Sequence, residues 1–262
     1  MLSMGDKDVM VVLPTLGKRL LHLGLALESC STLAQSVSLT LCVVAPVAAI
    51  DARKLAADHG AQLVDDPGTG MADAINAALV TRSSEKYYVW LGDDDVLVSP
   101  GIRRLIAALD ADDTAVVAHG QCEYMDTEGT TIALNRGGKL AQFLLTWGPN
   151  LIPHPGTVVS IDALEKVGGF SPGLSYALDL DVFLKLRKAG RFVAVPAVAS
   201  RFRWHPESLT VADRRASSRE AMSVKARHLP RWLRWMSPLW HWPIAWLSAL
   251  AAQRVNTLAS RS

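Results

Sequence analysis

Three consecutive aspartates, Asp93, Asp94 and Asp95, directly follow a short apolar run over residues 87–92. The run is rich in aromatic residues and too short for a helix, so it predicts a buried strand. Carboxylates at the exit of such a strand need water, a cation or a hydrogen-bond donor, because burial of a bare charge is costly. Mg²⁺ and Mn²⁺ prefer oxygen ligands, and Mg²⁺ is usually held by one or two carboxylates together with substrate phosphates. The triplet therefore predicts a site for a divalent metal and a diphosphate.

The triplet also has a purely structural interpretation, as a solvated acidic turn in front of the next helix. Ser99 would then be the N-cap of that helix and Pro100 its first residue, positions that serine and proline favour. Acidic turns are common, so the triplet by itself does not separate the two interpretations.

The elements around the triplet predict an α/β fold, because strands and helices alternate along the first half of the chain. Such alternation is typical of a mostly parallel, Rossmann-like sheet flanked by helices on both faces, and ligands bind such sheets at the carboxyl ends of the strands. The predicted strands are 9–13, 38–44, 61–64, 87–92 and 115–119, and the predicted helices are 18–35, 48–58, 70–81 and 100–109.

The pattern changes after Gly120, where turn residues at 126–129 predict a hairpin. No internal repeat or low-complexity linker interrupts the chain, so residues 1–210 are predicted to form one domain. Its second half is predicted to contain three helices and a strand, at 139–146, 161–167, 179–189 and 157–160 respectively.

The composition fits one large domain in a reducing compartment. Of the 262 residues 50% are hydrophobic, and the net charge of +2 gives no strong attraction to nucleic acid. The three cysteines, Cys30, Cys42 and Cys122, are an odd number without metal-ligand spacing, which argues against a disulfide framework. Neither a signal peptide nor an uninterrupted apolar stretch of about 20 residues is visible, so we expect a cytoplasmic protein without a standard membrane-spanning helix.

Several short motifs occur in one order along the chain, at 11–19, 66–68 with 73–76, 91–95, 154–157, 167–170 and 179–185. Together they resemble family 2 glycosyltransferases over roughly residues 9–210. The resemblance implies a GT-A fold, a nucleotide-sugar donor, Mg²⁺ or Mn²⁺ as cofactor, and transfer to an acceptor hydroxyl with inversion. The family favours UDP, but its acidic run after the second strand is absent at 43–46, so GDP and dTDP remain alternatives.

The resemblance implies roles for residues of the donor half, about 1–120. Pro14 and Thr15 match the family's nucleotide-binding edge at the end of the first strand. Asp95 matches its metal-binding aspartate, and a metal there would neutralise the diphosphate as charge builds on it. Lys18 and Arg19 could contact phosphate, but a basic pair that opens a helix is more often solvated. The residues matched to the segments near the base and ribose are Asp66, Asp73, Asn76, Asp93 and Asp94.

In the acceptor half, about 121–210, the resemblance places the catalytic base at Asp179, near the start of a helix. A carboxylate there can take the proton of the acceptor hydroxyl. Asp181 is a competing candidate, because Leu178 stands where the family commonly has an acid, and Asp179 could instead be an N-cap.

Four further residues are candidates on weaker grounds. Asp93 and His205 are possible metal ligands, although His205 could equally be a hydrogen-bonded structural histidine. His154 and Trp204 are predicted on the acceptor side.

Residues 211–262 form a separate, basic and tryptophan-rich segment that we predict to be helical and amphipathic. Five of the eight tryptophans lie within 232–246, interleaved with arginines and prolines. Tryptophan favours the bilayer interface and arginine favours anionic headgroups, so the segment predicts attachment to a membrane surface. A helix that packs on the catalytic domain or forms a dimer contact is the alternative. No nucleic-acid-binding module is recognisable.

Three function classes follow from these features. The first is a metal-dependent, inverting glycosyltransferase at the cytoplasmic membrane face, with a carbohydrate or lipid-linked acceptor in envelope polysaccharide or glycolipid synthesis. The second is another nucleotide-binding α/β enzyme, such as a nucleotidyltransferase. A dinucleotide oxidoreductase is disfavoured, because no Gly-x-Gly-x-x-Gly follows the first strand. The third is an inactive, membrane-associated interaction protein.

Overall fold

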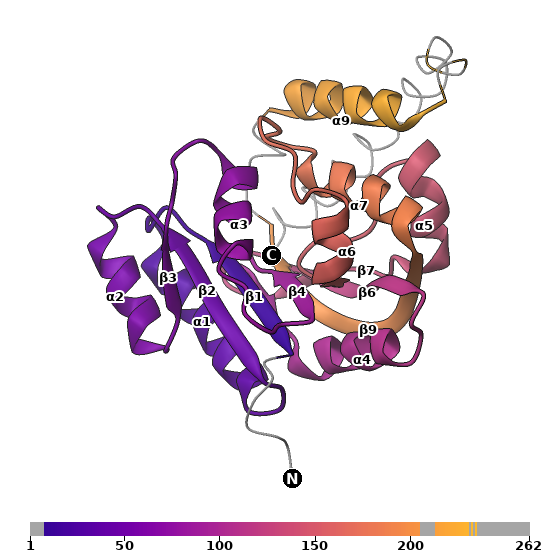
Figure 1. Ribbon diagram of the computed structural model, residues 1–262. Helices are drawn as coiled ribbons and strands as arrows, with labels where there is room; N and C mark the ends of the chain where they lie inside the picture. Colours follow the sequence, from indigo (N-terminus) through magenta and orange to yellow (C-terminus); the bar gives the residue numbers. More distant parts are fainter. Residues whose placement is uncertain (1–7, 205–212, 231, 233, 235–262) are drawn as a thin grey trace.

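The computed structural model describes residues 8–204, 213–230, 232 and 234 (Figure 1). In this part of the chain, nine strands form one sheet in the order β3-β2-β1-β4-β8-β6-β9-β5, with β7 paired to β6. The strands are β1 (Val9–Pro14), β2 (Leu39–Ala45), β3 (Gln62–Asp65), β4 (Tyr87–Trp90), β5 (Val96–Leu97), β6 (Ala115–Met125), β7 (Thr131–Asn135), β8 (Thr157–Ser160) and β9 (Arg191–Arg203). The helices are α1 (Leu20–Ala34), α2 (Ile50–Asp58), α3 (Met71–Leu79), α4 (Ser99–Asp110), α5 (Gly138–Trp147), α6 (Ile161–Lys166), α7 (Leu178–Ala189) and α9 (Arg214–His228).

The first four strands of the sheet form the parallel, helix-connected unit that the alternation predicts. β1 pairs in parallel with both β2 and β4, and β2 pairs in parallel with β3. Every residue of β1 is buried, as expected for a central strand that is covered on both faces. The carboxyl ends of β1, β2 and β4 therefore meet at one edge of the sheet.

The prediction of a mostly parallel sheet is wrong for the second half, where the strand directions are mixed. β8 lies antiparallel between β4 and β6, and β7 and β5 are antiparallel to β6 and β9. The physical reason lies in the connections. β6 and β7 form the predicted hairpin, which makes them antiparallel, and no β-α-β crossover joins β4 to its neighbour β8, so these two strands need not be parallel. The described fold is thus mixed α/β.

The long strand β9 has no counterpart among the predicted strands. It pairs in parallel with β6, but the register jumps from Ala194 to Val198. Pro196 lies within this irregularity, and proline in a strand is confined to such places because it cannot donate a ladder hydrogen bond. The proline therefore hides the strand from a sequence pattern.

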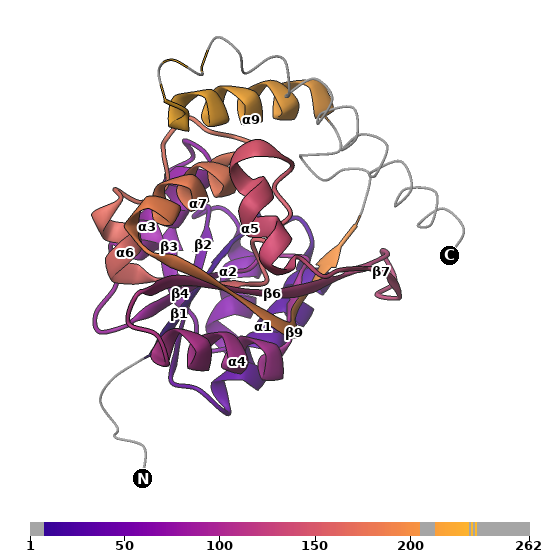
Figure 2. The same cartoon turned by 90° about the vertical axis from the view of Figure 1, so that its right-hand side faces the viewer.

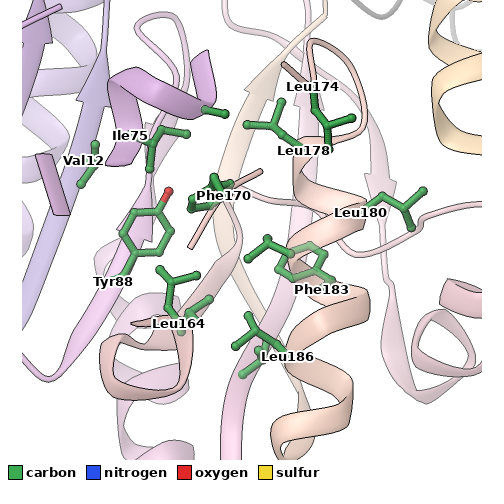
Figure 3. Close-up of a cluster of buried hydrophobic side chains, with 14 of the residues drawn as sticks. Val12, Ile75, Tyr88, Leu164, Phe170, Leu174, Leu178, Leu180, Phe183 and Leu186 are labelled. Carbon is green, nitrogen blue, oxygen red and sulfur yellow. The ribbon is translucent and has the colours of Figure 1, made fainter. Parts of the chain in front are cut away.

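Helices cover both faces of the sheet, as predicted (Figure 2). In β1, Met10 and Val12 point into a core beneath α3, α5, α6 and α7, whereas Val11 and Leu13 point into a core beneath α1, α2 and α4. Figure 3 shows the first core, in which Phe170 packs against Tyr88 and Phe183 lies on α7.

The prediction that Ser99 caps α4 is wrong. Ser99 is the first residue of the helix, Val98 is the N-cap, and no side chain caps this end. The short strand β5 pairs with β9 between the aspartates and α4, so the triplet is not the cap of that helix. The carboxylates therefore do not cap α4.

Of the predicted segment 211–262, the described part contains the helix α9, which packs across α7 in both views (Figures 1 and 2). The proposed boundary at residue 210 and most of the tryptophan cluster lie outside the described residues. Among the helices that are described, none has the length and apolarity needed to cross a membrane.

Candidate functional site

Parallel pairing of β1 and β4 brings two predicted motifs together at the sheet edge. Val12 is opposite Trp90, so the segments that follow β1 and β4 leave the sheet side by side. The Thr15 hydroxyl then donates to Oδ2 of Asp93 at 2.7 Å and accepts the Gly17 N–H at 3.0 Å. Gly17 has a φ of +74°, and a Cβ there would lie 2.9 Å from Ala49, so glycine is required for this turn. Pro14, the last residue of β1, fixes the start of the turn.

Arg19 belongs to this cluster, although it is not among the predicted site residues. Its Nη1 forms an ion pair with Asp94 and lies 3.8 Å from Oδ1 of Asp93. The sequence offered only the basic pair Lys18–Arg19 as a sign of this contact, and such a pair at a helix start is more often solvated. Only the fold shows that α1 begins opposite the aspartate turn.

Asp95 lies deeper than its two neighbours and is held by the end of β9. The residue is only 3% exposed, and its Oδ1 accepts the backbone N–H of Arg203 at 3.0 Å. Burial, reinforced by the charge of Asp94, raises the pKa of Asp95 to about 8. Burial also raises the pKa of Asp93.

Arg203 is a second site residue missing from the predicted set. The residue is buried, and its guanidinium donates to the carbonyls of Asp94, Asp126 and Thr127 at 3.1, 3.0 and 2.8 Å. It thereby joins the aspartate turn, the β6–β7 hairpin and the end of β9. Trp204 follows, and its ring meets that of Tyr124 edge-on at a centroid distance of 5.7 Å.

The carboxylate cluster fits a divalent cation that completes its coordination with substrate oxygens. Within the described residues, no group of three or more His, Cys, Asp or Glu side chains is arranged as a ready-made metal cage. Mg²⁺ needs no such cage when diphosphate supplies ligands. Burial raises the pKa of both Asp93 and Asp95, and a cation bound between them would favour their ionised forms. His205 lies outside the described residues.

The other predicted donor residues occupy different positions. Asp66 follows β3, across β2 from β1, and its carboxylate accepts the Gly68 N–H at 2.9 Å in a local turn. Asp73 lies in the first turn of α3. Asn76, on the same helix, donates to the Phe170 carbonyl at 2.8 Å and accepts its N–H at 3.1 Å. Asn76 therefore ties the donor half to the acceptor half.

Asp179 lies in the first turn of α7 and is partly buried. Its Oδ2 accepts Nδ2 of Asn150 at 3.0 Å, and its Oδ1 accepts the Leu180 N–H at 2.7 Å. Burial outweighs these hydrogen bonds and raises the pKa of Asp179 to about 6. A carboxylate with such a pKa is ionised at neutral pH and is still basic enough to accept a proton.

Asp181, the competing candidate, is saturated with donors. Its carboxylate accepts the Ser171 hydroxyl at 2.6 Å and lies 3.0 Å from both Lys185 Nζ and His228 Nε2. Burial opposes ionisation, but these partners hold the pKa of Asp181 well below its usual range. It is therefore a weak base whose oxygens are already engaged, and the geometry favours Asp179.

His154 is a core histidine. It is 6% exposed and packs edge-on against Trp90 at 4.0 Å and stacked on Phe170 at 5.8 Å between ring centroids. Within the described residues, no atom hydrogen-bonds either ring nitrogen. Burial lowers the pKa of His154 well below its usual value, so the ring is neutral.

The carboxyl end of β4 and the start of α7 lie at the same end of the first core. In Figure 3, Val12, which is opposite Trp90, lies at the same end of the core as Leu178, whereas Leu186 lies at the other end. Tyr88, His154 and Phe170 fill the space between β4 and α7. The aspartate turn follows β4 at this end of the core, and Asp179 lies in the first turn of α7 at the same end.

The sequence matches no protein-family model and no curated protein, but the fold matches solved structures. Staphylococcus aureus TarS residues 1–349 in complex with UDP-GlcNAc is similar with a TM-score of 0.63 and 12% identity, over 84% of this chain and 66% of that one. The chain spans less than two thirds of TarS, and 39% of a longer TarS chain.

Two further structures are similar over more of their length. The Pyrobaculum calidifontis mannosyltransferase PcManGT, with GDP-Man and Mn²⁺, gives a TM-score of 0.58 and 17% identity, over 98% of this chain and 79% of that one. Mycobacterium tuberculosis glucosyl-3-phosphoglycerate synthase, with Mn²⁺, UDP and phosphoglyceric acid, gives a TM-score of 0.61 and 18% identity, over 84% of this chain and 78% of that one. The chain therefore has the mixed α/β fold of these GT-A-type glycosyltransferases.

Proposed function

We propose that the chain is an inverting family 2 glycosyltransferase that moves a sugar from a nucleotide-diphosphate donor to an acceptor hydroxyl. The observation that carries the proposal is the pair of carboxylate groups at one end of the first core. A carboxylate cluster suited to a divalent cation follows β4 in the donor half, and Asp179, with a pKa of about 6, lies at the start of α7 in the acceptor half. The order of the sequence motifs and the shared fold with nucleotide-sugar enzymes support the same reaction.

On the donor side, Asp95 and Asp93 would hold Mg²⁺ or Mn²⁺, which when bound would act as a Lewis acid on the departing diphosphate. Thr15 fixes the carboxylate of Asp93, and the end of β9 fixes that of Asp95. Arg19 adds a cation beside the aspartate turn, where diphosphate oxygens would lie. UDP is the favoured nucleotide, with GDP and dTDP as the alternatives.

On the acceptor side, Asp179 takes the proton of the attacking hydroxyl. Asn150 orients the carboxylate through Oδ2, and the Leu180 N–H fixes the other oxygen. With one base and no covalent intermediate, the hydroxyl displaces the diphosphate in a single step. Such a displacement inverts the anomeric centre, as it does in inverting glycoside hydrolases.

The donor is tested by thermal unfolding of the full chain with UDP-GlcNAc or GDP-mannose, each with and without Mn²⁺. A true donor at about 100 times its Kd raises the free energy of unfolding by about 2.7 kcal/mol. We expect this increase with one nucleotide only when Mn²⁺ is present, and we expect Asp95→Asn to abolish it. Equal shifts with and without Mn²⁺ would remove the metal from the proposal, and no shift with any donor would favour the inactive interaction protein.

We further propose that the acceptor is presented at the cytoplasmic face of the membrane. The tryptophan and arginine pattern of 231–246 motivates this, although most of that segment lies outside the described residues. The described helix α5 adds a second observation: Leu140 and Phe143 are 63% and 61% exposed, and Trp147 continues the same face. Arg136 and Lys139 are exposed beside them, a combination that suits an anionic lipid surface.

A further inference from the structure

Helix α7 begins without a cap of its own. Its N-cap is Ala177, whose side chain cannot accept a hydrogen bond, so the position of the helix start depends on contacts from elsewhere in the fold. The carboxylate of Glu220, on α9, instead binds the turn that leads into the helix. It accepts N–H groups from Ser175, Tyr176 and Ala177, with closest distances of 3.1, 2.7 and 2.7 Å. A carboxylate at this place also complements the positive end of the helix dipole.

The same helix α9 holds the loop that carries Asn150. The Lys225 ammonium donates to the carbonyl of Gly148, and Lys225 is buried at this contact. Two residues later, Asn150 accepts the Ile152 N–H at 3.1 Å and donates to Asp179. Through Glu220 and Lys225, α9 therefore fixes both the helix start that bears Asp179 and the loop that hydrogen-bonds to it.

Further contacts anchor α9 between these two points and at its end. Val224 is fully buried in the core beneath α7, and His228 reaches Asp181 at 3.0 Å. Glu220, Val224 and His228 are spaced four residues apart, so one face of α9 docks on α7. Polar side chains therefore hold α9 on α7, together with the apolar contact of Val224.

We propose that Glu220 is a positioning residue for Asp179, and that α9 belongs to the acceptor side of the active site. This inference rests on the proposed function. Glu220 fixes residues 175–177, which lead into the first turn of α7, and with them the direction in which the Asp179 carboxylate points. A misplacement of about 1 Å at a reacting group can cost about 100-fold in rate.

The test compares Glu220→Ala and Glu220→Gln with the control Glu28→Ala, which removes an exposed carboxylate from α1 on the opposite face of the sheet. Nucleotide release from UDP-GlcNAc or GDP-mannose is measured with Mn²⁺, well below the unfolding temperature of each variant. We expect Glu220→Ala to lower kcat by about 10- to 100-fold with an unchanged KM for the donor. Glu220→Gln, which keeps an acceptor oxygen, should recover part of the loss, and Glu28→Ala should match wild type.

Hydrogen–deuterium exchange gives a readout that needs no activity. Glu220→Ala should speed exchange over residues 175–180 and leave the β1–β4 strands unchanged. Unchanged exchange there, or an unchanged kcat, would overturn the inference, and so would a parallel loss of donor binding and kcat. If Glu220→Ala does not fold, the same criteria apply to Glu220→Gln. Wild type that neither binds a donor nor releases nucleotide would instead refute the proposed function, whatever the exchange of the variants shows.

Discussion

Replacement of Asp179 by asparagine separates the proposed base chemistry from folding. The variant keeps the size of the side chain and an oxygen that can accept from Asn150, but it cannot take a proton. A general base typically contributes about 10²- to 10⁴-fold, so we expect kcat to fall by that factor while donor binding is retained.

The pKa of about 6 also fixes the pH dependence of wild type. Below about pH 6, kcat should fall about tenfold per pH unit, because the protonated acid cannot accept the hydroxyl proton. Nucleotide release from the donor that gives the thermal shift is followed from pH 5 to 8. An Asp179→Asn variant with wild-type kcat, or an acidic limb near pH 4, would refute the assignment.

Stability should change in the opposite direction from activity. The pKa of Asp179 is higher in the folded chain than its ordinary value of 3.8, so ionisation opposes folding as pH rises from about 4 to 6. The shift corresponds to about 3 kcal/mol above pH 6, a cost that asparagine does not carry. In calorimetry, the stability of Asp179→Asn relative to wild type should rise over this range and then stay constant. A difference that does not vary with pH would mean that Asp179 is not held in a desolvated site.

Two further predictions concern the second carboxylate and the surface. Asp181→Asn leaves Lys185 and His228 without their buried partner, so we expect a loss of about 3 kcal/mol at pH 7 in chemical denaturation. Because the pKa of Asp181 is lowered in the folded state, the wild-type advantage should decline progressively as pH falls below about 4, and an advantage that does not change with pH there would contradict the assigned ion pairs. Phe143→Ser should reduce co-sedimentation with phosphatidylglycerol vesicles more than Leu21→Ser, which removes an exposed leucine from α1, and equal effects would contradict a role for α5.

Local pattern predicted the elements of the donor half well, because each strand there is a short apolar run followed by its own helix. The apolar run at 87–92 predicts the strand, and the aspartates follow it directly in the sequence. Because α/β sheets bind ligands at the carboxyl ends of their strands, this order predicts the aspartates at the ligand-binding edge. The second half was harder. β9 contains Pro196 and has no partner nearby in the sequence, and its pairing with β6 exists only after the chain has folded.

For the site, the sequence by itself determined which carboxylates could do chemistry: the triplet at 93–95, and Asp179 or Asp181 near the start of α7. Only the tertiary structure decided their roles. Asp179 and Asp181 are two residues apart in one helical turn, yet burial raises the pKa of the first and donors from distant residues lower that of the second. The partners Arg19, Arg203, Asn150 and Glu220 are far away along the chain, and no pattern of spacing predicts them. A pKa depends on the charges and the desolvation that surround a group in space, and these are set only when the chain is packed.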